Sequence, residues 1–286
     1  LASLNPDGSW PAGAEVALRV RLEIEGAWTE WLTLGRYGRG EGLPRSESCP
    51  PSRGAEVKVD VIASARLATR AEVRLGLRRS PRGEAPCLRR FVLDLWQRQA
   101  APPEPRRVRH PAWGRTLDVP RRSQGMADPK IASRACSPTS LGMVLAFHGR
   151  RCTTEEVAAG VEDHAADILG NWAFNVFYAG ERGCAATARH LFGWSAVEDE
   201  IAAGRPVVLS HRYPVGGLEN GAISGTVGHL IVVVGFTVEG DVVVNDPAGN
   251  PSKGRAVRRV YRRDQLWRSW QEHAEGVVYL VRPRGR

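Results

Sequence analysis

The strongest constraint on the fold is an alternation of apolar and polar residues that begins near Ala14. Every second position is apolar, at Val16, Leu18, Val20, Leu22 and Ile24. This period of two is typical of a half-buried β-strand. It returns in 57–61, 73–77 and 91–95, with proline and glycine between these segments. With no helical pattern among them, residues 1–100 are predicted to form an antiparallel β-sandwich.

Proline and arginine dominate the stretch that follows. Residues 101–115 are too poor in apolar side chains to pack and are stiffened by proline, so we interpret them as a linker. A chain of 286 residues is long enough for two domains. The expected division is therefore 1–100, 101–115 and 116–286.

The third segment combines helical and strand patterns. Helices are expected over 138–148, from Thr153 with the capping-box partner Glu156, over 185–192 and over 196–203. Strands are expected over 206–211, 229–236, 241–245 and 277–281. Helices first and strands second predict an α+β domain.

Charge and hydropathy restrict the partners. The formal net charge is +9, but the basic residues are scattered in short clusters without the interleaved aromatic residues of a single-strand binder, so nucleic acid is an unlikely partner. No apolar run approaches the ~18 residues of a membrane helix. The first ten residues carry no secretion signal, yet the chain starts at leucine. We expect an exported or cell-surface protein whose signal segment lies outside this chain, with a cytoplasmic location as the alternative.

Five cysteines match neither a zinc pattern nor a dense disulfide framework. In an exported protein, Cys49 would pair with Cys87 and Cys152 with Cys184, which leaves Cys136 unpaired. Alternatively, all five are reduced and pack as small apolar residues.

Cys136 comes directly before the helix expected from Pro138. Unpaired N–H groups and the positive end of the helix dipole at that position favour a thiolate, the nucleophilic form of cysteine. Structural burial is the alternative for a single cysteine at such a place.

His229 opens the apolar strand 230–236, and Asp246 ends the next strand. The connection at Glu239 and Gly240 is short enough for a hairpin. In an antiparallel pair the start of one strand neighbours the end of the next, so His229 and Asp246 are predicted to meet. A carboxylate there would orient the imidazole and stabilise the imidazolium.

Three motifs together resemble the papain-like peptidases related to bacteriocin leader-processing enzymes. They are Ala135-Cys136-Ser137-Pro138, Gly228-His229-Leu230 and Val244-Asn245-Asp246-Pro247. The resemblance covers residues 116–286. It implies a nucleophile at Cys136, a general base at His229, Asp246 as its orienter, and an acyl-enzyme route at a peptide or amide bond.

Two further positions enter through the same resemblance. Gln124 resembles the glutamine that donates a hydrogen bond to the oxyanion; a solvated loop residue is the alternative. The family usually has glycine after the nucleophile, whereas this chain has Ser137, which would be unfavourable if the backbone needed a positive φ there. Thr139 and Ser140 are expected to cap the helix, and His211 to be structural.

The resemblance implies a peptide or protein substrate and neither a metal nor an organic cofactor. Trp28 and Trp31 in the first domain could mark a surface for carbohydrate or another cell-surface ligand, although at least one of them is expected in the core. Two alternatives to hydrolysis remain: amide transfer of the transglutaminase type, and a peptidase fold kept as a binding module with weak or no turnover.

Overall fold

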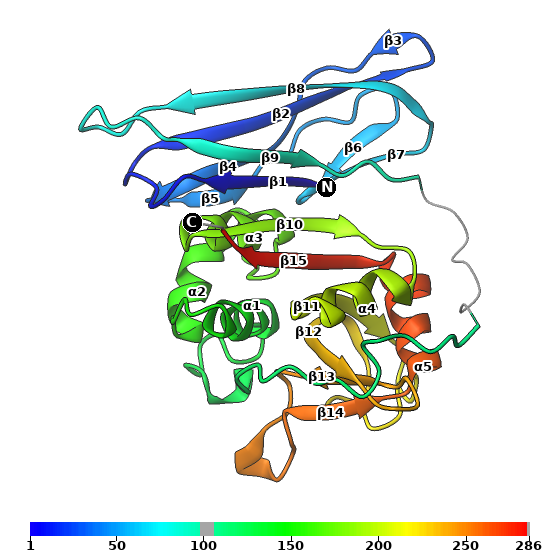
Figure 1. Ribbon diagram of the computed structural model, residues 1–286. Coiled ribbons are helices and arrows are strands. Elements are labelled where there is room, and N and C mark those ends of the chain that lie inside the picture. The colour runs from blue at the N-terminus through cyan, green and yellow to red at the C-terminus, as the bar shows by residue number, and fades with distance from the viewer. Residues whose placement is uncertain (98–105, 285–286) are drawn as a thin grey trace.

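The computed structural model describes residues 1–97 and 106–284, which form an all-β part followed by a mixed part (Figure 1). The strands of the first part are β1 (Ala2–Pro6), β2 (Glu15–Ile24), β3 (Ala27–Trp28), β4 (Leu32–Gly40), β5 (Leu43–Ser46), β6 (Ala55–Lys58), β7 (Val61–Ser64), β8 (Ala68–Arg78) and β9 (Leu88–Leu93). All their pairings are antiparallel. The antiparallel all-β character predicted from the alternation is confirmed.

Strand β2 is the centre of the first part, because it pairs with β3, β4 and β8 while β5 extends the sheet beyond β4. Strands β1 and β9 form a second pair, and β6 and β7 a third. The alternation at 57–61 belongs to β6 and β7, two strands with a tight turn between them at Val59, where φ is +60°. Four strands, β1, β3, β4 and β5, lack a clear alternation and were missed.

The second part contains helices and one large antiparallel sheet, which confirms the α+β prediction. Its helices are α1 (Cys136–Phe147), α2 (Thr154–Val161), α3 (Trp172–Glu181), α4 (Trp194–Ala202) and α5 (Arg263–Trp267). Two short 3₁₀ helices, η1 (Gln124–Met126) and η2 (Pro251–Lys253), and the π-helix η3 (Arg268–Glu272) complete the set. Its strands are β10 (Cys184–His190), β11 (Val207–Tyr213), β12 (Thr226–Phe236), β13 (Val242–Asn245), β14 (Arg258–Tyr261) and β15 (Val277–Pro283). The sheet order is β10-β15-β11-β12-β13-β14.

Several local predictions are confirmed. Thr153 caps α2 and its hydroxyl accepts from the Glu156 N–H while the Glu156 carboxylate accepts from the Thr153 N–H, which completes the capping box. Strands β12 and β13 pair as the expected antiparallel hairpin. Figure 1 shows α1 and α2 on one side of the sheet and α4 and α5 on the other.

The helix predicted over 185–192 is wrong, because Cys184–His190 form strand β10. Alanine-rich segments favour helices, but β10 pairs over its whole length with β15, from Cys184 opposite Pro283 to His190 opposite Val277. Ala186 and Ala188 are buried in the core. Sheet pairing and burial have therefore outweighed the local propensity.

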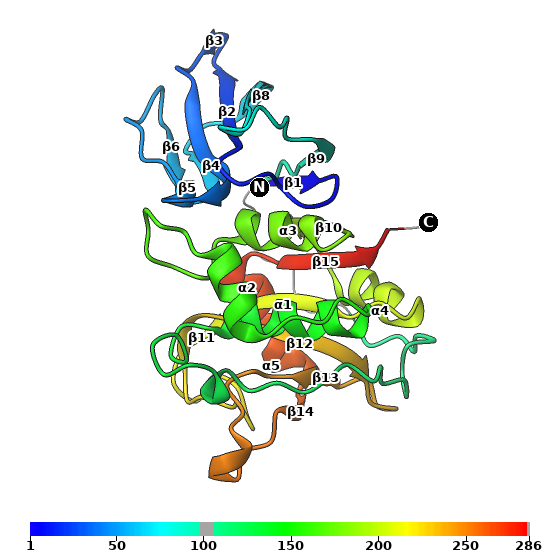
Figure 2. The same cartoon turned by 90° about the vertical axis from the view of Figure 1, so that its left-hand side faces the viewer.

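The two parts share a packed boundary, seen from two sides in Figures 1 and 2. Phe174 and Phe177 project from α3 into the core of the first part, where the Phe177 ring lies 5.2 Å from Trp10 and the Phe174 ring 5.0 Å from Tyr37. Asn5 on β1 bonds the backbone of Ala186 in both directions, at 3.0 and 2.9 Å. Helix α3 thus belongs to both cores.

Part of the predicted linker falls in 98–105, outside the described residues. In the rest of it, residues 106–109 are exposed, whereas Ala112 is fully buried and Trp113 forms a β-bridge with Phe236 of β12. All five cysteines are free thiols. Among the described residues, no helix has the length and apolar content needed to cross a membrane.

Truncating Phe177 tests the shared core. Phe177→Ala is expected to lower the free energy of unfolding by about 3 to 5 kcal/mol, because it opens a cavity where α3 meets the first part. Urea denaturation measures the change. Phe192→Ala, at a ring that is 58% exposed, is the matched control and should cost under ~0.5 kcal/mol. Equal losses in the two variants would contradict the packing.

Candidate active site

Cys136 is the first residue of α1, and not the residue before it as predicted. It is half-buried at the helix start. Burial by itself would raise the pKa of the thiol, but a hydrogen bond and the charge of His229, together with the backbone N–H groups of Leu230 and Ser137, lower it below the ordinary value. The helix start and the imidazole therefore act in the same direction, toward thiolate.

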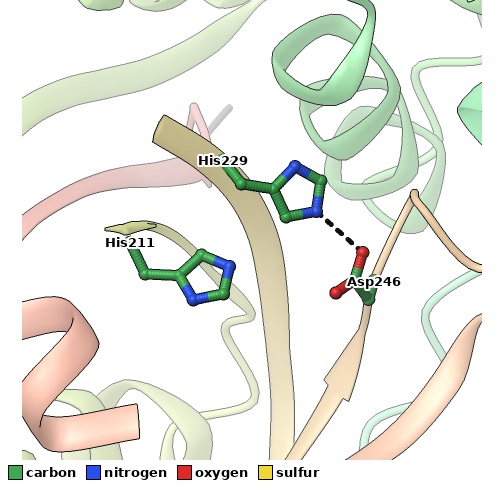
Figure 3. A group of neighbouring side chains, drawn as sticks. All are labelled: His211, His229 and Asp246. Atoms are coloured by element: carbon green, nitrogen blue, oxygen red, sulfur yellow. Dashed lines mark hydrogen bonds and ion pairs between the residues drawn. The ribbon is translucent and has the colours of Figure 1, made fainter. Parts of the chain in front are cut away.

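The structure brings His229 to both Cys136 and Asp246. His229 Nε2 donates to Asp246 Oδ1 over 2.8 Å, and the imidazole also makes a side-chain hydrogen bond with the Cys136 thiol. With Nε2 directed at the carboxylate, Nδ1 is the nitrogen left for the sulfur. Figure 3 shows the ring edge-on to Asp246 with its other nitrogen turned away.

Burial would lower the pKa of His229, yet the Asp246 charge and hydrogen bond, with a further contribution from Cys136, raise it above the ordinary value. The same pair lowers the pKa of Asp246 against the opposing effect of burial. A raised imidazole pKa beside a lowered thiol pKa defines a pH window in which the thiolate–imidazolium pair is populated. The window opens as pH rises through the thiol pKa and closes as pH rises through the imidazole pKa.

Asp246 is fully buried and its two oxygens are held by donors. Ala248 N–H donates to Oδ1 over 2.8 Å and Tyr261 O–H donates to Oδ2 over 2.6 Å. Nothing in the sequence pattern pointed to Tyr261, which lies on β14, a strand that was not predicted. These bonds fix the carboxylate plane, and hence the direction in which the imidazole is held.

A serine ties the nucleophile helix to the histidine strand. Ser140 Oγ donates to the backbone carbonyl of Leu230, the residue after His229, over 3.0 Å. The predicted capping role of Thr139 and Ser140 is wrong, because Ala135 is the N-cap residue and no side chain caps α1. Ser140 instead sets the distance between the helix start and β12.

Ser137 does not strain the backbone. It lies in α1, outside the set of non-glycine residues with positive φ, and its side chain is completely buried. The positive φ that would make serine unfavourable after the nucleophile is therefore absent at this position.

Gln124 sits at the start of η1, and its backbone N–H donates to Pro247, the residue after Asp246. Its Nε2 donates to the Ala132 carbonyl over 2.9 Å, which leaves one of its two hydrogens for another acceptor. The buried Oε1 has no hydrogen-bond partner among the described residues. Gln124 is thus held against the loop that leads to Cys136.

His211 lies opposite His229 on the neighbouring strand β11. Burial lowers its pKa to about 3, so the ring is neutral, and its Nε2 has no partner among the described residues. Ligand atoms of His211, His229 and Asp246 lie within 4.8 Å of one another (Figure 3). A metal ion there would have to replace the bond between His229 and Asp246 inside a fully buried cluster, so we assign these atoms to orientation of the histidine.

A basic pocket of about 490 Å³ flanks η1. Arg121, Arg122 and Arg258 contribute to its lining together with Ser123 and Met126. Cys136 does not line it. The pocket therefore neighbours the Gln124 loop, and the thiol itself lies outside it.

Residues 116–276 match the model of the Peptidase_C39 like family, over more than half of the chain. No curated protein sequence matches. Among similar solved structures is a double glycine motif protease from an AMS/PCAT transporter in complex with the leader peptide, with 20% identity, 59% of this chain and 94% of that chain covered, and a TM-score of 0.37. A C39-like peptidase from Bacillus anthracis has 15% identity, with 60% of this chain and 98% of that chain covered and a TM-score of 0.43. The peptidase domain of Streptococcus ComA, a bi-functional ABC transporter involved in a quorum sensing pathway, has 16% identity, with 53% of this chain and 93% of that chain covered and a TM-score of 0.38.

Replacing the buried carboxylate tests its effect on the thiol. Asp246→Asn removes the charge that stabilises the imidazolium, so the pH midpoint for alkylation of Cys136 by iodoacetamide should rise by at least about one unit. Mass spectrometry of the tryptic peptide 135–150, in which Cys136 is the only cysteine, gives this midpoint. Asp264→Asn, at an acid paired with Arg262, is the control. An unchanged midpoint in Asp246→Asn would refute the coupling.

Proposed function

Because the chain belongs to the Peptidase_C39 like family of cysteine peptidase-like hydrolases, we propose that it cleaves peptide bonds through an acyl-enzyme on Cys136. His229 is the general base and acid, Asp246 orients it, and Gln124 donates to the oxyanion. The observation that supports the proposal most is the hydrogen-bonded series from the Cys136 thiol through His229 to Asp246.

In the first half-reaction the Cys136 thiolate attacks the carbonyl carbon of the substrate. The oxygen becomes an oxyanion, for which Gln124 Nε2 and the N–H groups at the start of α1 are the proposed donors. The imidazolium of His229 then gives its proton to the departing nitrogen. The C–N bond breaks, an amine leaves, and a thioester on Cys136 remains.

In the second half-reaction water attacks the thioester while His229 takes its proton. The C–S bond breaks, the acid product leaves, and the thiolate–imidazolium pair returns. An amine in place of water would give amide transfer by the same steps. The two outcomes differ only in the acceptor, so an assay with an added amine must distinguish them by product mass.

The remaining parts of the proposal concern the N-terminal region. We divide the chain into residues 1–100, 101–115 and 116–286, and treat the first segment as a sandwich-type recognition module because β1, β2, β4 and β9 contribute side chains to one shared core. Trp28 and Trp31 are both half-exposed, which corrects the expectation that one lies in the core. Arg21 lies 4.7 and 4.9 Å from their ring centres, so a ligand meets an arginine–tryptophan surface.

Such a surface favours an anionic carbohydrate or another acidic cell-surface ligand over a neutral sugar, because guanidinium groups cover the ring faces. An exported or cell-surface location remains a prediction.

The nucleophile is tested by substitution. Cys136→Ala should abolish cleavage of any peptide that the wild type cleaves while leaving the unfolding transition in place. Cys87→Ala, at an exposed cysteine, is the control and should retain full activity. In the wild type, Cys136 should alkylate readily at pH 6, where an ordinary thiol with a pKa near ~8.5 is under ~1% ionised. Cleavage by Cys136→Ala, or an ordinary thiol profile, would refute the proposal.

The oxyanion donor is tested separately. Gln124→Ala should lower kcat by about 100- to 1000-fold with little change in KM, because the bond forms only as negative charge develops on the oxygen. The alkylation profile of Cys136 should stay at the wild-type position. Gln265→Ala, at a half-buried glutamine of α5, provides the matched control. A rise in KM at constant kcat would instead indicate a substrate-binding role.

A further inference from the structure

Ser137, directly after the nucleophile, has two hydrogen-bond partners that the proposed chemistry does not use. Its Oγ lies 2.9 Å from Asn175 Oδ1 on α3 and 3.0 Å from the hydroxyl of Tyr279 on β15. Ser137, Asn175 and Tyr279 are all fully buried. A polar group in such a position is retained only where its bonds are satisfied.

The direction of each bond follows from the donors available. Asn175 Nδ2 donates to the carbonyls of Leu169 over 3.0 Å and of Asn171 over 2.8 Å, which uses both of its hydrogens. Asn175 Oδ1 is therefore the acceptor, and Ser137 must donate to it. The Tyr279 hydroxyl then donates to Ser137. No alternative orientation of these groups satisfies all the bonds.

The series continues away from the site. Asn171 caps α3 by accepting from the Phe174 N–H over 3.2 Å, and its Nδ2 donates to Asp163 Oδ2 over 2.9 Å. Asp163 Oδ1 accepts from the backbone N–H of Ser46 over 2.9 Å. Ser46 ends β5 in the N-terminal all-β part. Asp163 and Asn171 are 0% and 1% exposed, so the whole series is shielded from water.

A second bond ties the start of α3 to the N-terminal all-β part. The Trp172 N–H donates to Asp60 Oδ2 over 2.6 Å. Asp60 lies between β6 and β7, so two carboxylates, one from each side of the boundary, fix the start of α3. Since Asn175 lies within about one helical turn of these contacts, they fix its position.

We infer that Asp163, Asn175 and Ser137 are positioning residues through which the docked N-terminal all-β part sets the position of Cys136 relative to His229. The inference rests on the proposed function for its meaning in catalysis. A buried series with every bond made has one arrangement, and removing one partner leaves others unsatisfied and free to shift. The first turn of α1 then loses its lateral support, and the thiol loses its alignment with the imidazole.

Two variants interrupt the series at opposite ends. Ser137→Ala deletes a single oxygen and leaves the bonds of Asn175 to Leu169 and Asn171 intact. Asp163→Asn replaces one acceptor oxygen by a donor. This donor faces either the backbone N–H groups of Ser46, Ala165 and Ala166 or the side-chain Nδ2 of Asn171. Asn5→Ala is the control, because Asn5 is also buried and also bridges the two parts. Its side chain bonds the backbone of Ala186 and, over 3.4 Å, the carbonyl of Val176 on α3, but it bonds none of the side chains of the series.

The readout is the pH midpoint for alkylation of Cys136 by iodoacetamide, followed on peptide 135–150, together with thermal unfolding. Ser137→Ala and Asp163→Asn should each raise the midpoint by about one unit, which slows alkylation roughly tenfold at pH values well below the wild-type midpoint. In a peptide cleavage assay kcat should fall with KM unchanged. Asn5→Ala should lower the unfolding temperature and leave the midpoint at the wild-type value.

Wild-type midpoints in both variants, or an equal shift in Asn5→Ala, would overturn the inference. If Asp163→Asn does not fold, Ser137→Ala decides alone, since it removes only a hydroxyl. The proposed function fails on a different result, an ordinary thiol profile and no cleavage in the wild type. The difference in midpoint between variants and wild type can be measured in either case.

Discussion

The buried contact between His229 and Asp246 is the interaction on which the rest of the site depends. An imidazolium in the protein interior is costly unless a carboxylate compensates it, and that carboxylate needs donors of its own. Tyr261 and the N–H of Ala248 provide them. Because Asp246 stabilises the positive charge of His229 through Nε2, the other ring nitrogen can stabilise Cys136 as a thiolate. Strands β12, β13 and β14 therefore serve the chemistry chiefly by fixing one carboxylate.

The position of the sulfur has a different origin. Cys136 begins α1, and α1 is held from two directions: Ser140 bonds the strand of His229, and Ser137 bonds α3 and β15. Helix α3 in turn places two phenylalanines in the core of the N-terminal part. The all-β part is consequently built into the support of the nucleophile, which distinguishes it from a module joined only by a flexible connection. Edge strand β10, whose backbone is bonded by Asn5 and Ser3, adds to the same boundary.

Local patterns predicted the elements whose side chains reveal their surroundings. Strict alternation predicted β2 and β8, and a threonine with a glutamate three positions later predicted the start of α2. The failures occurred where the local pattern is neutral or misleading. Residues 185–192 have the composition of a helix, yet Cys184–His190 form a strand because they pair with β15 at the edge of the sheet. Helix α3 was missed because its apolar residues face two cores, so no single apolar stripe appears along it.

The sequence by itself determined the pairing of His229 with Asp246, because a short connection between two apolar strands leaves an antiparallel hairpin as the only close arrangement. It also placed Cys136 at a helix start. Tertiary structure alone decided which side chains hold these groups: Tyr261, Ser140, Asn175 and Asp163 come from segments far apart in the chain. A hairpin is a local consequence of chain geometry. The meeting of α1, α3 and β5 depends on how separate elements pack, and no spacing along the chain encodes that.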